Sequence, residues 1–228
     1  MTDLQAHYNQ LYQDSIQKIS NGSYQTDHLI SSPSDRRMGL TLIARPNTHT
    51  RNVIRQFLDE LKTVDPLQYY YPVSDIHITV LSVISCYNDF SLTDIDTPDY
   101  IHIITEAIKD VKPFNINFTG VTVSPSCILI QGFPQDGTLQ QIRNAVRSGF
   151  KFSELQQSID KRYTLQTAHV TAVRFKEDIQ NLSGFLNLIE EYRTYQFGLS
   201  PIYELELVYN DWYHHKEKVQ LLHKFQLK

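Results

Sequence analysis

Two short patterns in the sequence place histidine beside threonine in a way that suits phosphate chemistry. One reads His-Ile-Thr-Val from His77, and the other reads His-Val-Thr-Ala from His169. In a β-strand, residues two apart point to the same face, roughly 6.5–7 Å from one another. Imidazole accepts and donates protons near neutral pH, and a threonine hydroxyl is a neutral donor for a phosphate oxygen. Two such strands facing a cleft would present His77, Thr79, His169 and Thr171 to one ligand.

The pairing of the motifs carries more weight than either motif alone. A single histidine in a strand is more often a hydrogen-bonded structural residue than a catalyst. With nine histidines in the chain, a His-x-Thr with apolar neighbours is expected by chance about 0.1 times. Two copies, each inside a strand-like run, therefore favour the chemical interpretation.

Each motif follows a strand and an amphipathic helix in the same order, which indicates two copies of one structural unit. The alternative is a chance interleaving of strands and helices. The ranges expected for the two units are 39–44, 48–64 and 69–83, the last with a break at Pro72, and then 127–132, 137–149 and 165–173. Further helices are expected at 3–20, 97–111 and 178–192, and further strands at 114–123, 202–209 and 217–227. Strands interleaved with helices, with several hairpin-like neighbours, predict an α+β protein with mainly antiparallel sheets.

The paired His-x-Thr motifs, 92 positions apart (169 − 77), resemble those of the 2H phosphoesterase superfamily, which includes bacterial 2′-5′ RNA ligase-like proteins and cyclic nucleotide phosphodiesterases. The resemblance implies a bilobal, pseudo-symmetric α+β fold with two antiparallel sheets, outer helices and a central cleft. It covers residues 38–228 as the catalytic domain, with one motif per lobe. Residues 1–37 then form an N-terminal extension made of a helix and a loop.

The same resemblance implies a metal-independent phosphodiesterase with no cofactor. One histidine would be neutral and act as the base, while the other would be protonated and act as the acid. The roles of His77 and His169 stay open, because they exchange with the direction of reaction. Thr79 and Thr171 would hold the phosphate oxygens. The expected substrate is a nucleotide or RNA-end phosphodiester, either a 2′,3′-cyclic phosphate or a 2′-5′ linkage.

Two alternatives use the same cleft. In the first, the protein is a binding module that holds a nucleotide or RNA end without turning it over. In the second, it is a 2H enzyme for a phosphodiester that is not RNA. Turnover of 2′,3′-cyclic nucleotides in EDTA distinguishes both alternatives from the expected activity.

A second group of residues is suited to contact the substrate around the phosphate. Tyr71 and Tyr163 each lie six positions before a motif histidine, where they could stack a base at the rim of the cleft. Arg37 precedes the first strand and could reach an anion, although a solvated loop charge is the simpler interpretation. Trp212 lies in the last hairpin loop and could form an aromatic lip. Arg174 is expected to face away from the phosphate, because it lies three positions after Thr171.

The composition limits the classes of partner. The chain has 228 residues and a net charge of −4, which argues against an extended nucleic-acid surface and leaves a small anionic ligand open. Neither a membrane span nor a signal peptide is expected, and the two cysteines, Cys86 and Cys127, are expected to be free thiols. The adjacent histidines His214 and His215 would point apart in a strand, which disfavours a metal site. These features predict a cytoplasmic, monomeric protein, and the resemblance implies that it acts on a small nucleotide or a short RNA end.

Overall fold

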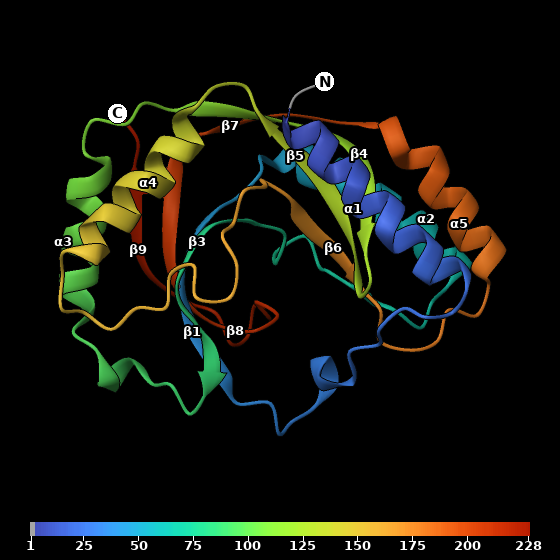
Figure 1. Cartoon of the computed structure of the whole chain (residues 1–228), viewed down its shortest axis with the longest axis horizontal. Coiled ribbons are helices and arrows are strands. Elements are labelled where there is room, and N and C mark those ends of the chain that lie inside the picture. Colours follow the sequence, from blue (N-terminus) through green and yellow to red (C-terminus); the bar gives the residue numbers. More distant parts are fainter. Residues whose placement is uncertain (1–2) are drawn as a thin grey trace.

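The computed structural model describes residues 3–228, and two antiparallel sheets form its framework (Figure 1). The first sheet has the strand order β3-β1-β8-β9, and the second has the order β2-β6-β5-β4-β7. The strands are β1 (Arg37–Ala44), β2 (Tyr69–Tyr70), β3 (Ile78–Asn88), β4 (Phe114–Ser124), β5 (Cys127–Pro134), β6 (Val170–Arg174), β7 (Gln196–Ile202), β8 (Glu204–Asp211) and β9 (Gln220–Gln226). The α+β class with antiparallel sheets is confirmed.

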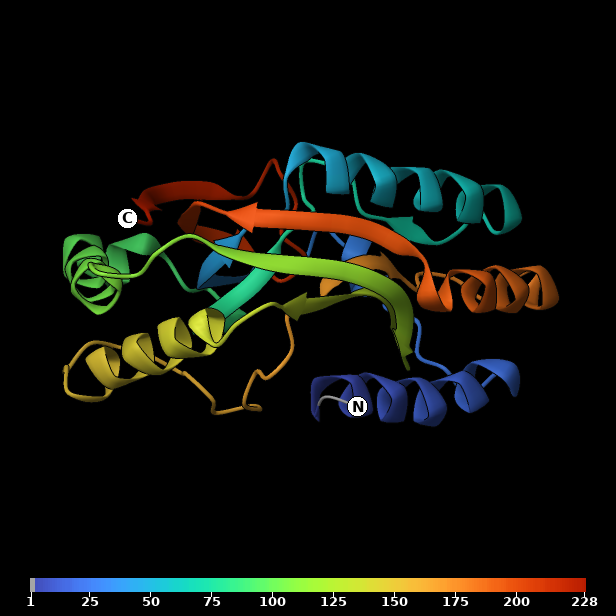
Figure 2. The same ribbon diagram turned by 90° about the horizontal axis from the view of Figure 1, so that it is seen from above.

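Helices cover both sheets. They are α1 (Asp3–Ser20), α2 (Thr48–Val64), α3 (Thr97–Ile108), α4 (Thr138–Lys151) and α5 (Leu182–Glu191), with short 3-10 turns η1 (His28–Ser31), η2 (Leu92–Asp94) and η3 (Tyr192–Thr194). Helices α3 and α4 pack together against the first sheet. Figure 2 shows α1 (dark blue) and α2 (teal) on opposite sides of the second sheet. The second sheet is therefore covered on both faces near β4.

The two predicted units have matching topology. In the unit β1–α2–β3, the two strands pair directly, and α2 packs against the second sheet. In the unit β5–α4–β6, the strands again pair directly, and α4 packs against the first sheet. Helix α2 begins at Thr48 as expected, and Asn47 caps it, because its side chain accepts a hydrogen bond from the Thr50 backbone N–H. Each lobe is thus built from one unit and buries the helix of the other.

Bulges in both motif strands change which side chains face the cleft. Between Thr79 and Leu81, β3 advances two residues while β1 advances one, and β6 does the same against β5 between Thr171 and Val173. An extra residue reverses the alternation of side chains beyond it. Arg174 consequently shares the cleft-facing side with Thr171. The expectation that Arg174 faces away was wrong for this reason.

Some element boundaries differ from the expected ranges near the second motif and in the C-terminal half. The expected strand 165–173 begins only at Val170. The expected helix 178–192 begins at Leu182, and the side chain of Asn181 caps it. Strand β7 was missed, because Gly198 and Pro201 weaken its strand pattern; proline is tolerated there because β7 is an edge strand. The C-terminal runs correspond to β8 and β9.

The N-terminal helix expected at 3–20 is confirmed as α1, and it packs on β4. The division of the chain into an extension of residues 1–37 and a catalytic domain of residues 38–228 stays a prediction. No helix within residues 3–228 is long and apolar enough to cross a membrane.

Candidate active site

The two His-x-Thr motifs open onto one cavity of about 700 Å³ between the sheets. His77, Thr79, His169 and Thr171 all line it, and each histidine immediately precedes its strand. The residues that alternate with them, such as Val80, are buried in the core. The alternation read from the sequence therefore brings the four predicted residues together.

His77 is held by the turn before β3. Its Nδ1 lies 2.7 Å from the backbone carbonyl oxygen of Asp75, which is itself buried. A carbonyl oxygen can only accept, so Nδ1 carries a proton and donates it. In the neutral ring, Nε2 is then the unprotonated nitrogen, free to accept a proton from a ligand in the cavity.

His169 is held from two directions. Its Nδ1 lies 2.7 Å from the hydroxyl oxygen of Thr167. The carbonyl oxygen of Thr167 accepts a 2.6 Å hydrogen bond from the guanidinium of Arg143, a residue of α4 that is 1% exposed. The same guanidinium donates to the carbonyl oxygens of Thr79 and Val80 in β3. One buried arginine therefore ties the two motif segments to each other.

Helix α1 also supports the His169 segment. The Tyr8 hydroxyl donates to the Gly132 carbonyl oxygen at 3.2 Å and accepts from the Gly132 N–H at 3.3 Å. Gly132 lies in β5, beyond the last residue of that strand that pairs with β6. The Tyr8 hydroxyl thus bonds both the N–H and the carbonyl of Gly132 where the segment before Val170 leaves the sheet. A side chain at Gly132 would overlap the carbonyl oxygen of Ala168, so this close approach requires glycine. These contacts explain why residues 165–169 are not a strand.

Replacing Tyr8 with phenylalanine is expected to lower the free energy of unfolding by about 1–3 kcal/mol, because it leaves two buried backbone groups without a partner. The matched control is Tyr12→Phe on the same helix, where the hydroxyl donates to Glu190 in an exposed bond, and a loss below about 1 kcal/mol is expected. Urea unfolding of both variants measures the difference. Equal losses in the two variants would show that Tyr8 does not support the His169 segment.

Burial lowers the pKa of both motif histidines to about 4. For His169, the nearby guanidinium of Arg143 and the ring of His77 lower the pKa further. For His77, the Asp75 carbonyl opposes the effect of burial and raises the pKa. Both imidazoles are therefore neutral at pH 7 in the empty cavity.

These shifts predict acid sensitivity of the fold. The ordinary pKa of histidine in the unfolded chain is about 6.5, so between pH 6.5 and 4 the unfolded state binds more protons than the folded state. Stability should fall as the pH is lowered through this window, by on the order of 1–3 kcal/mol per imidazole. Urea unfolding from pH 7.5 to 4 measures it, and the variant His77→Asn/His169→Asn should show a smaller fall. An identical fall in this variant would contradict the assignment.

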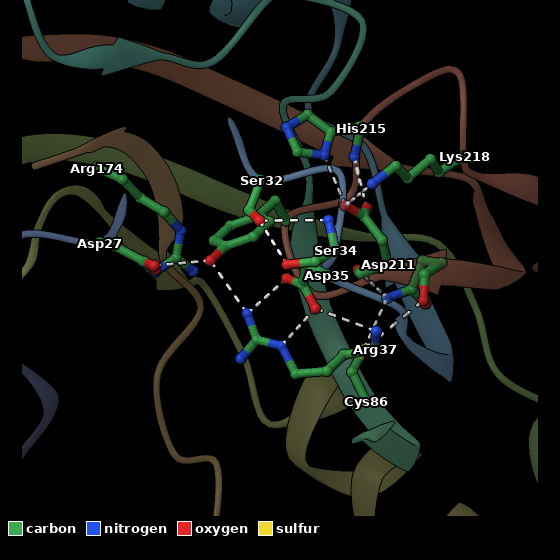
Figure 3. Close-up of polar contacts among 12 residues, drawn as sticks. Asp27, Ser32, Ser34, Asp35, Arg37, Cys86, Arg174, Asp211, His215 and Lys218 are labelled. Carbon is green, nitrogen blue, oxygen red and sulfur yellow. Dashed lines mark hydrogen bonds and ion pairs between the residues drawn. The ribbon is translucent and has the colours of Figure 1, made fainter. Parts of the chain in front are cut away.

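Arg174 supplies a positive charge to the cavity. Its Nε donates a 3.0 Å hydrogen bond to the Tyr71 hydroxyl. Its guanidinium lies 3.9 Å from the carboxylate of Asp27 (Figure 3). Tyr71 is 4% exposed, so it lies inside the cavity and not at its rim as expected. Tyr163, by contrast, is 70% exposed at the edge. The two tyrosines are thus not equivalent in the structure.

Trp212 lines the cavity, and two arginine side chains pack against its ring. The guanidinium carbons of Arg162 and Arg37 lie 4.5 Å and 4.8 Å from the centre of a Trp212 ring. Arg37 itself does not line the cavity, because its guanidinium is paired with Asp35 at 2.7 Å and bonded to the hydroxyl of Tyr213 (Figure 3). The structure therefore does not bring Arg37 to the ligand space, and direct contact of Arg37 with a substrate stays a prediction.

The sequence reasoning missed several residues of the site. Arg143 carried a readable signal, because it lies within the apolar stripe of α4 that is otherwise formed by Leu139, Ile142 and Val146. His7 of α1 lines the cavity without any such signal. Across the part of the chain that the structure describes, no group of three or more His, Cys, Asp or Glu side chains is placed to hold a metal ion.

Solved structures share this fold. LigT from E. coli, complexed with 3′-AMP, superposes with a TM-score of 0.57 at 13% sequence identity, over 84% of this chain and 99% of that chain. TT0787 of Thermus thermophilus gives 0.56 at 16% identity, over 83% and 97%. The conserved protein of unknown function ATU0111 from Agrobacterium tumefaciens gives 0.57 at 15% identity, over 91% and 97%.

Sequence comparison adds no nearer relative: no protein-family model and no curated protein matches the chain. The likeness to the solved structures nevertheless spans almost the whole length of each of them. The protein therefore has a LigT-like fold, which is the fold expected from the resemblance of its paired motifs to the 2H phosphoesterases.

Proposed function

We propose that the protein is a phosphodiesterase that acts on a nucleotide or RNA-end phosphodiester, either a 2′,3′-cyclic phosphate or a 2′-5′ linkage. The observation that carries the proposal is the meeting of both His-x-Thr pairs in one cavity that Arg174 also lines. The catalytic residues belong to the proposed domain of residues 38–228, and α1 of the extension supports them from outside.

The cavity offers the phosphate neutral and charged donors. Thr79 and Thr171 each supply a hydroxyl, and Arg174 supplies a guanidinium that suits two phosphate oxygens at once. Trp212 and Tyr163 supply aromatic surface for a base. LigT, which shares the fold, has been solved with 3′-AMP, with phosphate and with ATP, which supports a small nucleotide as the class of ligand.

In the proposed hydrolysis of a 2′,3′-cyclic phosphate, His77 acts as the base. Its Nε2 is unprotonated because Nδ1 donates to the Asp75 carbonyl, so it can accept a proton from the attacking water. The water oxygen forms a bond to phosphorus as the bond from phosphorus to one ribose oxygen breaks. His169, protonated, gives its Nε2 proton to that leaving oxygen, while its Nδ1–H keeps its hydrogen bond to the Thr167 hydroxyl oxygen.

The substrate itself sets the protonation states. With a pKa of about 4, His169 is neutral in the empty cavity at pH 7. A phosphodiester anion beside the ring stabilises the imidazolium and raises its pKa. Thr79, Thr171 and Arg174 then stabilise the additional negative charge that develops on the phosphate oxygens in the transition state. No step in this sequence uses a metal ion.

The test is a panel of 2′,3′- and 3′,5′-cyclic mononucleotides and end-labelled short RNAs with 2′-5′ or 3′-5′ linkages, assayed with and without EDTA. Hydrolysis of a 2′,3′-cyclic or 2′-5′ substrate at equal rates in both conditions is expected. Binding of these ligands without turnover would instead support a nucleotide-binding module. Turnover that is abolished by EDTA would contradict the proposed mechanism.

A further inference from the structure

A third histidine, His214, lies against His77 in the cavity. The centres of the two imidazole rings are 4.0 Å apart, with 34° between the ring planes. His214 comes from the loop between β8 and β9, and it lines the cavity together with His77 and Thr79. Its ring therefore covers a face of the His77 ring that solvent would otherwise reach.

The side chain of Asn210 fixes which nitrogen of His214 carries a proton. The Asn210 amide nitrogen donates to the Asp211 carbonyl oxygen at 2.9 Å and lies 3.0 Å from His214 Nε2. The Asp211 carbonyl oxygen can only accept, so the Asn210 atom that contacts both it and His214 must be the amide nitrogen, a donor. Nε2 of His214 must therefore accept the second hydrogen bond from this amide. His214 is thus held with its proton on Nδ1, and its Nε2 is not available to take a second proton.

Two features of His214 and Asn210 are energetically unfavourable. His214 adopts a left-handed backbone conformation with φ of 58°, which is uncommon for residues other than glycine. The side-chain oxygen of Asn210 is buried and has no hydrogen-bond partner among the described residues. Backbone strain and unsatisfied polar groups of this kind cluster at functional sites, where they are retained because of what they position.

We propose that His214 is a positioning residue for His77: its ring stacks on His77, keeps Nε2 of His77 aimed at the ligand and leaves the proton to His77 alone. The assignment of the base role to His77 rests on the proposed function. The stacking and its effect on the His77 ring do not, so they can be tested separately.

The charged groups around the pair define the expected effect. Burial dominates and lowers the pKa of both rings. Arg45, from the loop after β1, and Arg174, from β6, lower both pKa values further, while Glu206 of β8 raises that of His77. Removing the His214 ring admits water to His77 and should raise the pKa of His77 toward its ordinary value. Replacing His214 with an aromatic ring that cannot ionise should keep water out and leave the pKa of His77 low.

The experiment compares His214→Phe, which keeps a stacked ring, with His214→Asn, which removes the ring while tolerating the left-handed backbone. The readout is the pKa and tautomer of His77, followed by ¹H–¹⁵N NMR between pH 3.5 and 8. We expect the pKa of His77 to stay within about 0.5 of the parental value in the Phe variant. In the Asn variant we expect the pKa of His77 to rise by more than about 1. His223→Phe and His223→Asn, at an exposed position on β9, are the matched controls and should change neither value.

Activity provides the second readout. With the best substrate of the panel, His214→Asn should lower kcat about tenfold or more, and His214→Phe should retain most of it. An unchanged His77 titration in His214→Asn, or equal shifts in the Phe and Asn variants, would overturn the stacking role. The variant His77→Ala tests the proposed function itself: full activity in that variant would remove His77 as the base, while the titration would still decide the role of His214.

Discussion

Alanine at His77 or at His169 is expected to lower kcat by about 10²–10⁴-fold, the usual cost of a lost general acid or base. Both rings line the same cavity, and each is oriented through Nδ1, His77 by the Asp75 carbonyl and His169 by the Thr167 hydroxyl. Each variant removes one proton carrier and leaves the other in place. Measurement of kcat and KM in EDTA on the best substrate of the panel gives the result.

The control for these variants is His223→Ala, on the exposed face of β9, which should keep parental activity. Circular dichroism and urea unfolding check that each variant is folded. Each motif histidine lowers the free energy of unfolding in acid, because its pKa is lower in the folded state than in the unfolded chain. At pH 5 the folded variants should therefore be at least as stable to urea as the parent. Parental turnover in either folded variant would remove the paired-histidine mechanism.

Replacement of Arg174 by methionine is expected to lower kcat/KM by about 10²–10³-fold, as for the loss of a donor that stabilises transition-state charge. Arg174 lines the cavity, and its Nε is already held by the Tyr71 hydroxyl while Asp27 lies 3.9 Å from its guanidinium, so the side chain is oriented before a phosphate arrives. Lysine should restore only part of the loss, because a single ammonium cannot reproduce the planar, two-pronged contact.

The matched control for Arg174→Met is Arg36→Met. Arg36 is an exposed arginine that pairs with Asp89 on the surface, and its loss should leave kcat/KM within about twofold. Equal kcat/KM values in Arg174→Met and in the parent would show that the guanidinium does not hold the phosphate. That result would also restore the expectation, drawn from strict strand alternation, that Arg174 takes no part in the site.

The sequence predicted that the four motif side chains share one cavity, because strand alternation is a local property. His77 and Thr79 face one side and Ile78 faces the other, as a period of two requires. Helix α2 was predicted at its observed ends, since its apolar stripe is readable in the sequence. The repeated order of strand, helix and motif strand predicted the two-unit topology for the same reason.

The features that were missed depend on contacts between distant segments. The bulge that turns Arg174 toward the cavity arises from the pairing of β6 with β5, which alternation along one strand does not reveal. Tyr8 reaches Gly132 across 124 positions of the chain, and it is this hydroxyl that replaces strand pairing before His169. Strand β7 is specified by its neighbour β4 more than by its own residues, which include a glycine and a proline.

The dependence of kcat/KM on pH, measured in EDTA from pH 4 to 9, tests the central claim most directly. One histidine must be neutral while the other is protonated, so the full profile is bell-shaped, but with both pKa values near 4 in the free enzyme the ascending limb of kcat/KM lies at or below the acid end of this range. Because kcat/KM reports the free enzyme, where both pKa values are about 4, its maximum should lie on the acid side of neutrality and its value should fall as the pH rises. The descending limb of kcat should lie at higher pH, since the bound anion raises the pKa of the acid. A rate that rises steadily up to pH 9 would contradict the account.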